Sequence, residues 1–244
     1  MEIDRIAPTR RPAGRPAQFQ RWDDLLFLHW KVPAEALRPL VPASLALDTF
    51  EGDAYVGVVP FMMRDVHPTW AFPVAPISNF LETNVRTYVH RGGADPGVWF
   101  FSLDAANALA VGIARAFWDL PYHRATMSLE KRDGVIEYNT VRDGTPKGRC
   151  AVAYRHLGSP APAVPGTLEH FLAERYILYA ARDDGAMRLG RVHHAPYPLE
   201  RAELLRWDED LVAAAGITRP DAPPIAHYAA GVSVDVFALE DLAP

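Results

Sequence analysis

Residues 80–90 read FLETNVRTYVH, and they carry the clearest alternation of side chains in this chain of 244 residues. Successive side chains of a β-strand point to opposite faces of the sheet. One face of the stretch is apolar or threonine and suits a core; the other is polar and comprises Glu82, Asn84, Arg86, Tyr88 and His90. In an isolated antiparallel strand the polar face meets solvent, whereas in a barrel it can line an internal cavity. In a barrel, we expect Glu82 and Arg86 to point inward and to interact directly or through one bound ligand.

The segments before and after this stretch also have the composition of strands. They are rich in β-branched and aromatic residues and are bounded by glycine, proline and aspartate. Two of them, 124–141 and 176–194, hold a glycine between two strand-like halves, which predicts hairpins. The other predicted strands span residues 25–32, 45–50, 54–63, 97–103, 148–157 and 226–239.

Helical segments are fewer. The strongest spans residues 105–118, with Asp104 as its N-cap and with Pro121 preventing its continuation. Shorter helices are expected at 33–41, at 167–176 with Thr167 as cap, and at 208–216 with Asp208 as cap and Gly216 as terminator. Roughly nine or ten strands against three or four helices indicate an α+β, mainly β chain. The strands are mostly antiparallel, as in a barrel or two packed sheets with peripheral helices.

Composition narrows the functional classes. The chain is 49% hydrophobic with a net charge of −5, so it can bury a sizeable core, and without a basic stripe it is not expected to bind nucleic acid. The single cysteine, Cys150, allows neither an internal disulfide nor a cysteine-based zinc cluster. His193 and His194 are adjacent and point to opposite faces of a strand. We therefore expect no metal site and no cofactor.

The N-terminal segment is not expected to be a secretory signal. Residues 1–20 lack the apolar core of a secretory signal, and the longest apolar run of the strongest predicted helix, Ala108 to Ala114, is too short to span a bilayer. We expect an extended arm over residues 1–20 and a single barrel domain over residues 21–244, located in the cytoplasm and not bound to membranes. Homo-oligomerisation is left open.

Several segments, taken in order, resemble the acetoacetate decarboxylase superfamily, most closely an uncharacterised bacterial branch known as a domain of unknown function. They are ALRPLVPASLALD (36–48), FLETNVRTYV (80–89), FFSLDAANALAVGIARAFWDLPYHRA (100–125) and ERYILYAARDDGAMRLGRV (174–192). The resemblance covers roughly residues 22–237. It implies an acetoacetate decarboxylase-like conical β-barrel with a small internal cavity.

The resemblance breaks down where the family does its chemistry. The decarboxylases carry two consecutive lysines after the proline, and the first forms a Schiff base with the substrate. This chain has Tyr122 and His123 there, and its only lysines are Lys31, Lys131 and Lys147. The active-site glutamate of the family corresponds to Glu82. The substrate-orienting arginine of the family aligns near Asp23, with Arg21 two residues earlier and on the same strand face.

Three functions remain open. The first is a barrel that binds a small carboxylate or oxo-metabolite without turnover, through Arg86, Asn84, Tyr88 and Arg21. The second is a lysine-independent enzyme that uses Glu82 with Tyr122 or His123 for general acid–base chemistry, as in an enolisation, dehydration or hydrolysis. The third is a structural protein with a filled barrel, in which Tyr122 and His123 only pack. A desolvated Glu82 beside a hydrogen-bonded tyrosine or histidine would favour the enzyme.

Overall fold

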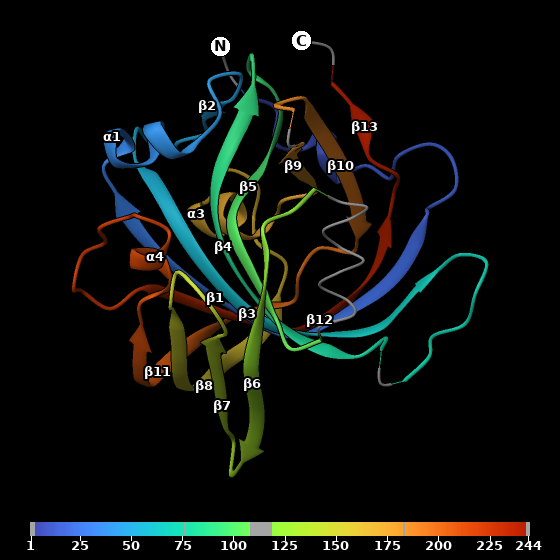
Figure 1. Cartoon of the computed structure of the whole chain (residues 1–244). Helices are drawn as coiled ribbons and strands as arrows, with labels where there is room; N and C mark the ends of the chain where they lie inside the picture. The colour runs from blue at the N-terminus through green and yellow to red at the C-terminus, as the bar shows by residue number, and fades with distance from the viewer. Residues whose placement is uncertain (1–2, 76, 108–118, 183, 243–244) are drawn as a thin grey trace.

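The computed structural model describes residues 3–75, 77–107, 119–182 and 184–242 (Figure 1). Strands dominate it, as the sequence predicts. The strands are β1 Gln18–Val32, β2 Ala46–Leu47, β3 Ala54–Pro68, β4 Phe80–Arg91, β5 Ala94–Ala105, β6 Tyr122–Arg132, β7 Val135–Arg142, β8 Arg149–Ala161, β9 Ile177–Ala181, β10 Met187–His194, β11 Leu199–Glu209, β12 Ile225–Val236 and β13 Glu240–Asp241. The short helices are η1 Ala7–Thr9, α1 Ala34–Leu37, η2 Arg38–Leu40, α3 Leu168–Ala173 and α4 Leu211–Ala214.

The strands form one continuous sheet that closes on itself. The order β5-β9-β10-β12-β1-β3-β4 returns to β5 and makes a closed ring, which we call the main ring. A second circuit leaves β5 through β6, β7, β8 and β11 and rejoins the main ring at β12. In Figure 1, β9 and β10 lie in the upper part of the molecule and β6, β7, β8 and β11 in the lower part. Pairs are antiparallel except β5 with β6 and β5 with β9.

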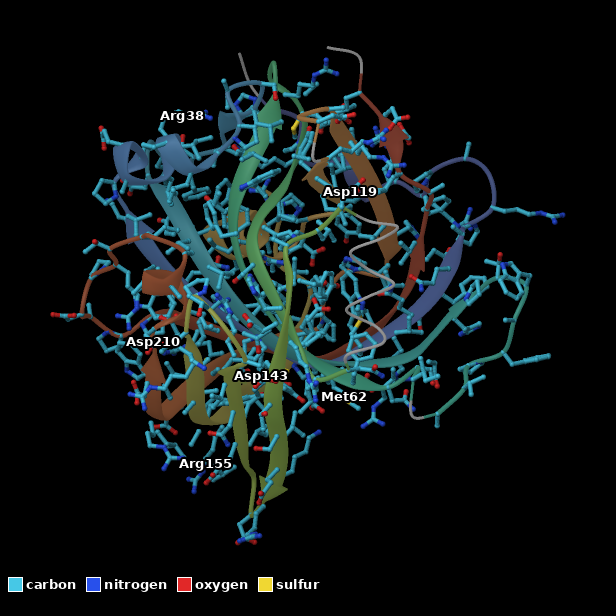
Figure 2. The ribbon with its side chains drawn as sticks, viewed as in Figure 1. Arg38, Met62, Asp119, Asp143, Arg155 and Asp210 are labelled. Atoms are coloured by element: carbon cyan, nitrogen blue, oxygen red, sulfur yellow. The ribbon has the colours of Figure 1, made fainter. Side chains whose placement is uncertain are left out.

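Each circuit encloses its own core. Leu25 and Phe27 of β1 face the interior of the main ring, where they join Phe61 of β3 in one cluster. Leu26 and Leu28 face the other way, into a second cluster with side chains of β7 and β8. Because both faces of β1 are covered, its sequence is a nearly continuous apolar run rather than an alternation. Charged side chains such as Arg155 and Asp210 lie at the outside of the molecule (Figure 2).

Most predicted elements are present, with some corrected bounds. Both hairpins form, and the side chain of Thr167 accepts a hydrogen bond from the backbone N–H of His170 and caps α3 as expected. The strand expected at 45–50 is shorter, since only Ala46–Leu47 pairs with β4. Strand β11 was not predicted from the sequence. Its residues, LERAELLRWDE, are charged and good helix formers, and they become a strand through pairing with β8 and β12.

Two predicted helix caps are wrong. Asp208 belongs to β11, and α4 starts after it, at Leu211, where Oε1 of Glu209 accepts from the N–H of Val212 at 2.6 Å. Asp104 belongs to β5, where its carboxylate accepts hydrogen bonds from the guanidinium of Arg142. In both cases the aspartate lies in a strand that pairs with residues far away in the sequence, which neighbouring residues alone do not reveal.

The structure tests only part of the predictions for the strongest helix and for the N-terminal arm. Residues 108–118 of the helix predicted at 105–118 lie outside the described residues. The last residues of the expected arm are strand, because β1 begins at Gln18. Arg5, earlier in the arm, binds the buried carboxylate of Asp48. No helix in the described part of the chain is long and apolar enough to cross a membrane.

Candidate functional site

A buried carboxyl–phenol pair lies inside the main ring. Strand β4 places Glu82 there, and the start of β6 places Tyr122 beside it, through the parallel pairing of Leu103 with Tyr122. The hydroxyl of Tyr122 donates to Oε2 of Glu82 at 2.9 Å. Only 2% of Glu82 is exposed. Two residues far apart in the sequence therefore meet in the interior.

Burial controls the protonation of this pair. It raises the pKa of Glu82 to about 8, because the carboxylate form loses its hydration; the hydrogen bond from Tyr122 lowers this pKa in part, and the charge of Asp104 raises it. Burial also raises the pKa of Tyr122 well above its ordinary value, so the phenol keeps its proton. At neutral pH, Glu82 is mostly a neutral acid that can exchange its proton close to pH 8.

His123 does not share this position. It follows Tyr122 on β6, so its side chain leaves the opposite face of the strand, where it is partly exposed. Its register partner on β5 is Asp104. Of the two candidates at the family's lysine positions, Tyr122 is the one that reaches Glu82.

Three further polar residues of β4 are buried on the same side as Glu82. Asn84, Arg86 and Tyr88 are 5%, 8% and 0% exposed. Arg86 Nη2 donates to the carbonyl of Leu172 in α3 at 3.2 Å, and its guanidinium lies 5.6 Å from the ring centre of Phe27. The inward orientation expected for Glu82 and Arg86 is confirmed. Their direct ion pair is not formed among the described residues, because β4 holds them four positions apart; an interaction through a bound ligand stays a prediction.

Tyr88 joins β4 to a histidine that the sequence analysis missed. Its hydroxyl donates to the carbonyl of Leu172 at 2.6 Å, and a carbonyl can only accept. Nε2 of His29, 2.6 Å from the same hydroxyl oxygen, must therefore carry the proton and donate to it. Burial lowers the pKa of His29 well below its usual range, so the ring is neutral and its Nδ1 is an acceptor. The sequence contained a signal for this histidine. His29 lies two residues after the inward-facing Phe27, and residues two apart in a strand share a face.

Arg86 differs from the other buried arginines of the described chain. The guanidinium of Arg142 is paired with Asp104, and that of Arg175 with Asp48. Arg86 has no carboxylate partner there, and its Nε lacks a hydrogen-bond partner. Within the same described residues, Oδ1 of Asn84 and Nδ1 of His29 are also buried and unpartnered. Buried polar groups are nearly always satisfied, so these three atoms are the ones that a polar ligand or ordered water inside the ring would pair with.

Arg21, predicted as a ligand contact, lies elsewhere. Its side chain is 56% exposed and pairs with Asp23 at 2.8 Å, and Arg64 also pairs with Asp23. Arg21 and Asp23 share a strand face, as expected, but that face of β1 is outside the buried group. Because a bulge in β1 follows Asp23, the alternation that leads to Leu25 and Phe27 does not extend back to Arg21.

The described residues contain neither a cluster of metal ligands nor a buried lysine amine. No group of three or more histidine, cysteine, aspartate or glutamate side chains there is arranged to hold a metal ion. The three lysines are all exposed, and two of them are paired: Lys31 with Asp53 and Lys131 with Asp24, both at 2.6 Å.

Gly57 on β3 makes room for His29. A Cβ at this position would lie 2.9 Å from both Cδ2 and Nε2 of His29. Gly57→Ala is therefore expected to lower the free energy of unfolding by about 1–3 kcal/mol, measured by urea denaturation. The His29→Ala background is the control, because removing the imidazole should abolish most of the extra cost. An equal cost in both backgrounds would contradict this packing.

The fold is that of acetoacetate decarboxylase-like proteins. The structure is similar to the enduracididine biosynthesis enzyme MppR complexed with pyruvate, with a TM-score of 0.65 and 10% identity, over 95% of this chain and 92% of that one. It is also similar to acetoacetate decarboxylase from Legionella pneumophila, with a TM-score of 0.65 and 13% identity, over 100% and 96% of the two chains.

The chain belongs to the DUF2071 family, described as an uncharacterized conserved protein, whose model matches residues 19–233. It is 40% identical over 219 residues to the uncharacterized protein YqjF of Bacillus subtilis (strain 168), covering 89% of both chains. The resemblance expected from the sequence is confirmed.

Proposed function

We propose that the interior of the main ring carries out acid–base chemistry on a small oxo-carboxylate, with Glu82 as the proton-transferring group and without a Schiff base. The observation that supports this most is the buried Glu82, whose pKa is raised to about 8 and whose Oε2 is held by Tyr122. General acids and bases work best when their pKa lies near the working pH. A merely structural glutamate gains nothing from such a pKa.

The two carboxyl oxygens of Glu82 have different roles in the proposed proton transfer. Tyr122 occupies Oε2, so Oε1 of Glu82 is directed to the substrate. As a base, ionised Glu82 removes a proton from the carbon next to the carbonyl, and the C–H electron pair moves into an enolate. As an acid, protonated Glu82 returns that proton. Arg86, the buried cation that has no carboxylate partner in the described chain, supplies the positive charge for the substrate's own carboxylate.

Binding without turnover is the second candidate. The Nε of Arg86 and Oδ1 of Asn84, unpartnered among the described residues, favour it, because both are recognition groups rather than proton-transfer groups. The ligand class is the same. MppR, which shares the fold, is known in complex with pyruvate, a small oxo-carboxylate.

Proton exchange tests the enzymatic proposal. Pyruvate in heavy water should exchange its methyl protons in the presence of the protein, as followed by proton NMR. Since only ionised Glu82 acts as the base, the rate should rise roughly 90-fold from pH 6 to pH 9 for a pKa of about 8.

Glu82→Gln is the decisive variant for this exchange. It should reduce the rate by about 100-fold or more, because the amide accepts no proton. Exposed Glu137→Gln serves as the matched control and should leave the rate unchanged. Pyruvate binding with no exchange above background would favour binding without turnover; no binding of pyruvate or related oxo acids would favour the filled barrel.

Absence of imine chemistry is a separate expectation. An imine-forming lysine needs a lowered pKa, whereas the contact with Asp53 raises the pKa of Lys31. Borohydride added to the protein with acetoacetate should leave no adduct, and carbon dioxide release should stay at background. A reduced adduct mapped by mass spectrometry to Lys31, Lys131 or Lys147 would overturn this expectation.

Cellular location, macromolecular partners and oligomeric state are predictions from the sequence. We propose a cytoplasmic protein that binds neither nucleic acid nor membranes, and sedimentation velocity would measure whether it forms a homo-oligomer.

A further inference from the structure

The wall of the main ring has a gap along β12. One edge of β12 pairs with β1 over its whole length, from Val236 to Ile225. The other edge pairs with β10 as far as the partners His194 and Val234, and with β11 from the partners Leu199 and Ala229. In the described chain, residues 230–233 have no strand partner on that edge, because residues 195–198 cross from β10 to β11 there. The two prolines of this crossing, at 196 and 198, have no N–H to donate.

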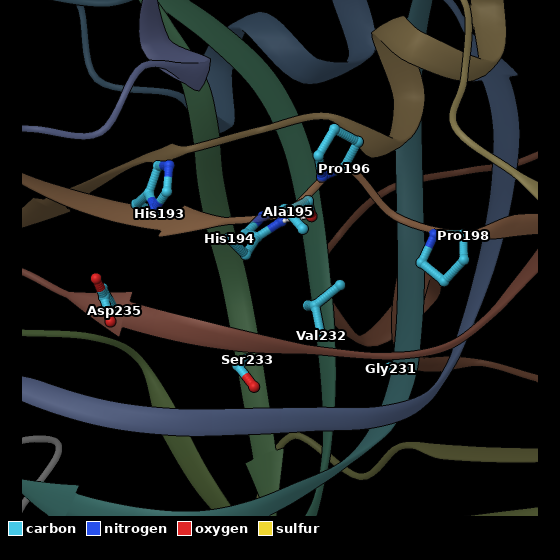
Figure 3. Close-up of a pocket in the computed structure, with 9 residues that line it drawn as sticks. All are labelled: His193, His194, Ala195, Pro196, Pro198, Gly231, Val232, Ser233 and Asp235. Carbon is cyan, nitrogen blue, oxygen red and sulfur yellow. Dashed lines mark hydrogen bonds between the residues drawn. The ribbon is translucent and has the colours of Figure 1, made fainter.

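A pocket of about 530 Å³ occupies this gap (Figure 3). Its outer walls come from Ala195 on the crossing and from the exposed Ser233 on β12. Its floor comes from His194 and Val232, whose side chains belong to the ring interior. Val232 lies in the same apolar cluster as Tyr122. The pocket and the proposed site therefore adjoin the same core.

The floor of the pocket is polar at one atom. Nδ1 of His194 donates to the carbonyl of Ala195 at 2.8 Å, because a carbonyl can only accept. Its Nε2 is then an acceptor, and it is buried without a partner among the residues that the structure describes. His194 stacks on Tyr176 with ring centres 4.4 Å apart, which holds this orientation. An acceptor of this kind is usually satisfied by water or by a polar solute.

The mouth of the pocket does not repel an anion strongly. Asp235 is the acidic side chain on its rim, and Arg11 from the N-terminal arm pairs with it at 3.0 Å. The side chain of Arg11 is 44% exposed, and its positive charge offsets the negative charge of Asp235 at the rim. A small hydrated carboxylate can approach this opening.

We propose that the pocket between β10, β12 and the crossing at residues 195–198 is the route by which a small oxo-carboxylate enters and leaves the main ring. The inference rests on the proposed function, since it needs a ligand site inside the ring. The main ring is closed by hydrogen-bonded strands, and this gap is where the pairing along β12 is interrupted. His194 supplies a hydrogen-bond acceptor between solvent and the interior.

Two plugging variants test the route. Ser233→Trp and Ala195→Trp place an indole on opposite walls of the pocket. Ser128→Trp, at an exposed serine of β6 that does not line the pocket, is the matched control. The readout is the association and dissociation of isotope-labelled pyruvate, followed by exchange broadening in NMR. Both plugs should lower both rate constants by about tenfold or more, while Kd changes less than about threefold. Ser128→Trp should behave as the unaltered protein.

The outcomes separate the two proposals. If the unaltered protein shows pyruvate exchange and the plugs match Ser128→Trp, the route is overturned and the interior site stands. If the plugs change Kd and leave the association rate as it was, the pocket is a binding site rather than a route, and the proposal is also overturned. If the unaltered protein binds no pyruvate, the proposed function fails and the route fails with it.

Discussion

Arg142→Met should lower the free energy of unfolding by about 3–5 kcal/mol, because it leaves the carboxylate of Asp104 buried and unpaired. Arg142 and Asp104 are 2% and 0% exposed. The guanidinium donates to both carboxylate oxygens, at 2.6 and 2.7 Å, and to the hydroxyl of Ser102 at 2.7 Å. The pair joins β7 to β5, so its loss loosens the contact between the second circuit and the main ring. Urea denaturation at neutral pH measures the effect.

Arg149→Met is the matched control for this substitution. Arg149 pairs with Asp208 at 2.8 Å, but its side chain is 57% exposed. Exposed ion pairs contribute little, so the control should lose less than about 1 kcal/mol. The double variant Arg142→Met, Asp104→Leu should recover much of the loss, since no charge is then left buried. A single variant within about 1 kcal/mol of the unaltered protein would refute the account.

Glu82→Gln should remove a large part of the pH dependence of stability. The folded protein holds the proton of Glu82 more tightly than the unfolded chain does, because burial raises the pKa from 4.5 to about 8. Between these values the unfolded chain has released the proton and the folded protein has not, so stability falls as pH rises through this window. The group can account for a decrease of at most about 5 kcal/mol, at about 1.36 kcal/mol per pKa unit.

The free energies of unfolding of Glu82→Gln and of the unaltered protein, plotted against pH, should cross. Below pH 4.5 the variant should match the unaltered protein or be slightly less stable, since both carry a neutral side chain and the amide oxygen can still accept from Tyr122. Above about pH 8 the variant should be the more stable protein by a few kcal/mol. Chemical denaturation across this range measures both, with Glu137→Gln, whose carboxylate is half exposed, as the control. Parallel curves for Glu82→Gln and the unaltered protein would show that Glu82 titrates normally.

Local sequence signals were sufficient for much of the fold. Alternation in residues 80–90 predicted β4 and the shared face of Glu82 and Arg86, and turn glycines predicted both hairpins. The adjacency of Tyr122 and His123 already required that only one of them face inward. These features depend on neighbours within a few residues, so a single sequence carries them.

Other features depend on residues far apart in the chain. β11 becomes a strand because β8 and β12 pair with it, against the helical composition of its residues. Asp104 is an ion-pair partner rather than a cap because β5 carries it to Arg142, 38 positions away. Local propensity cannot anticipate either outcome, because the deciding partner is absent from the local window.

The chemistry of the site also depends on closure of the ring. The sequence shows that Glu82 is present and that the family's lysines are not, and the absence of those amines needs no structure to establish. Three features of the site follow from which strands meet across the interior. Tyr122 donates to Glu82, Arg86 is buried without an acid in the described chain, and His29 is neutral. A pKa is set by desolvation and by charges within a few ångströms. Those distances exist only after β4, β6 and β1 have been brought around one core.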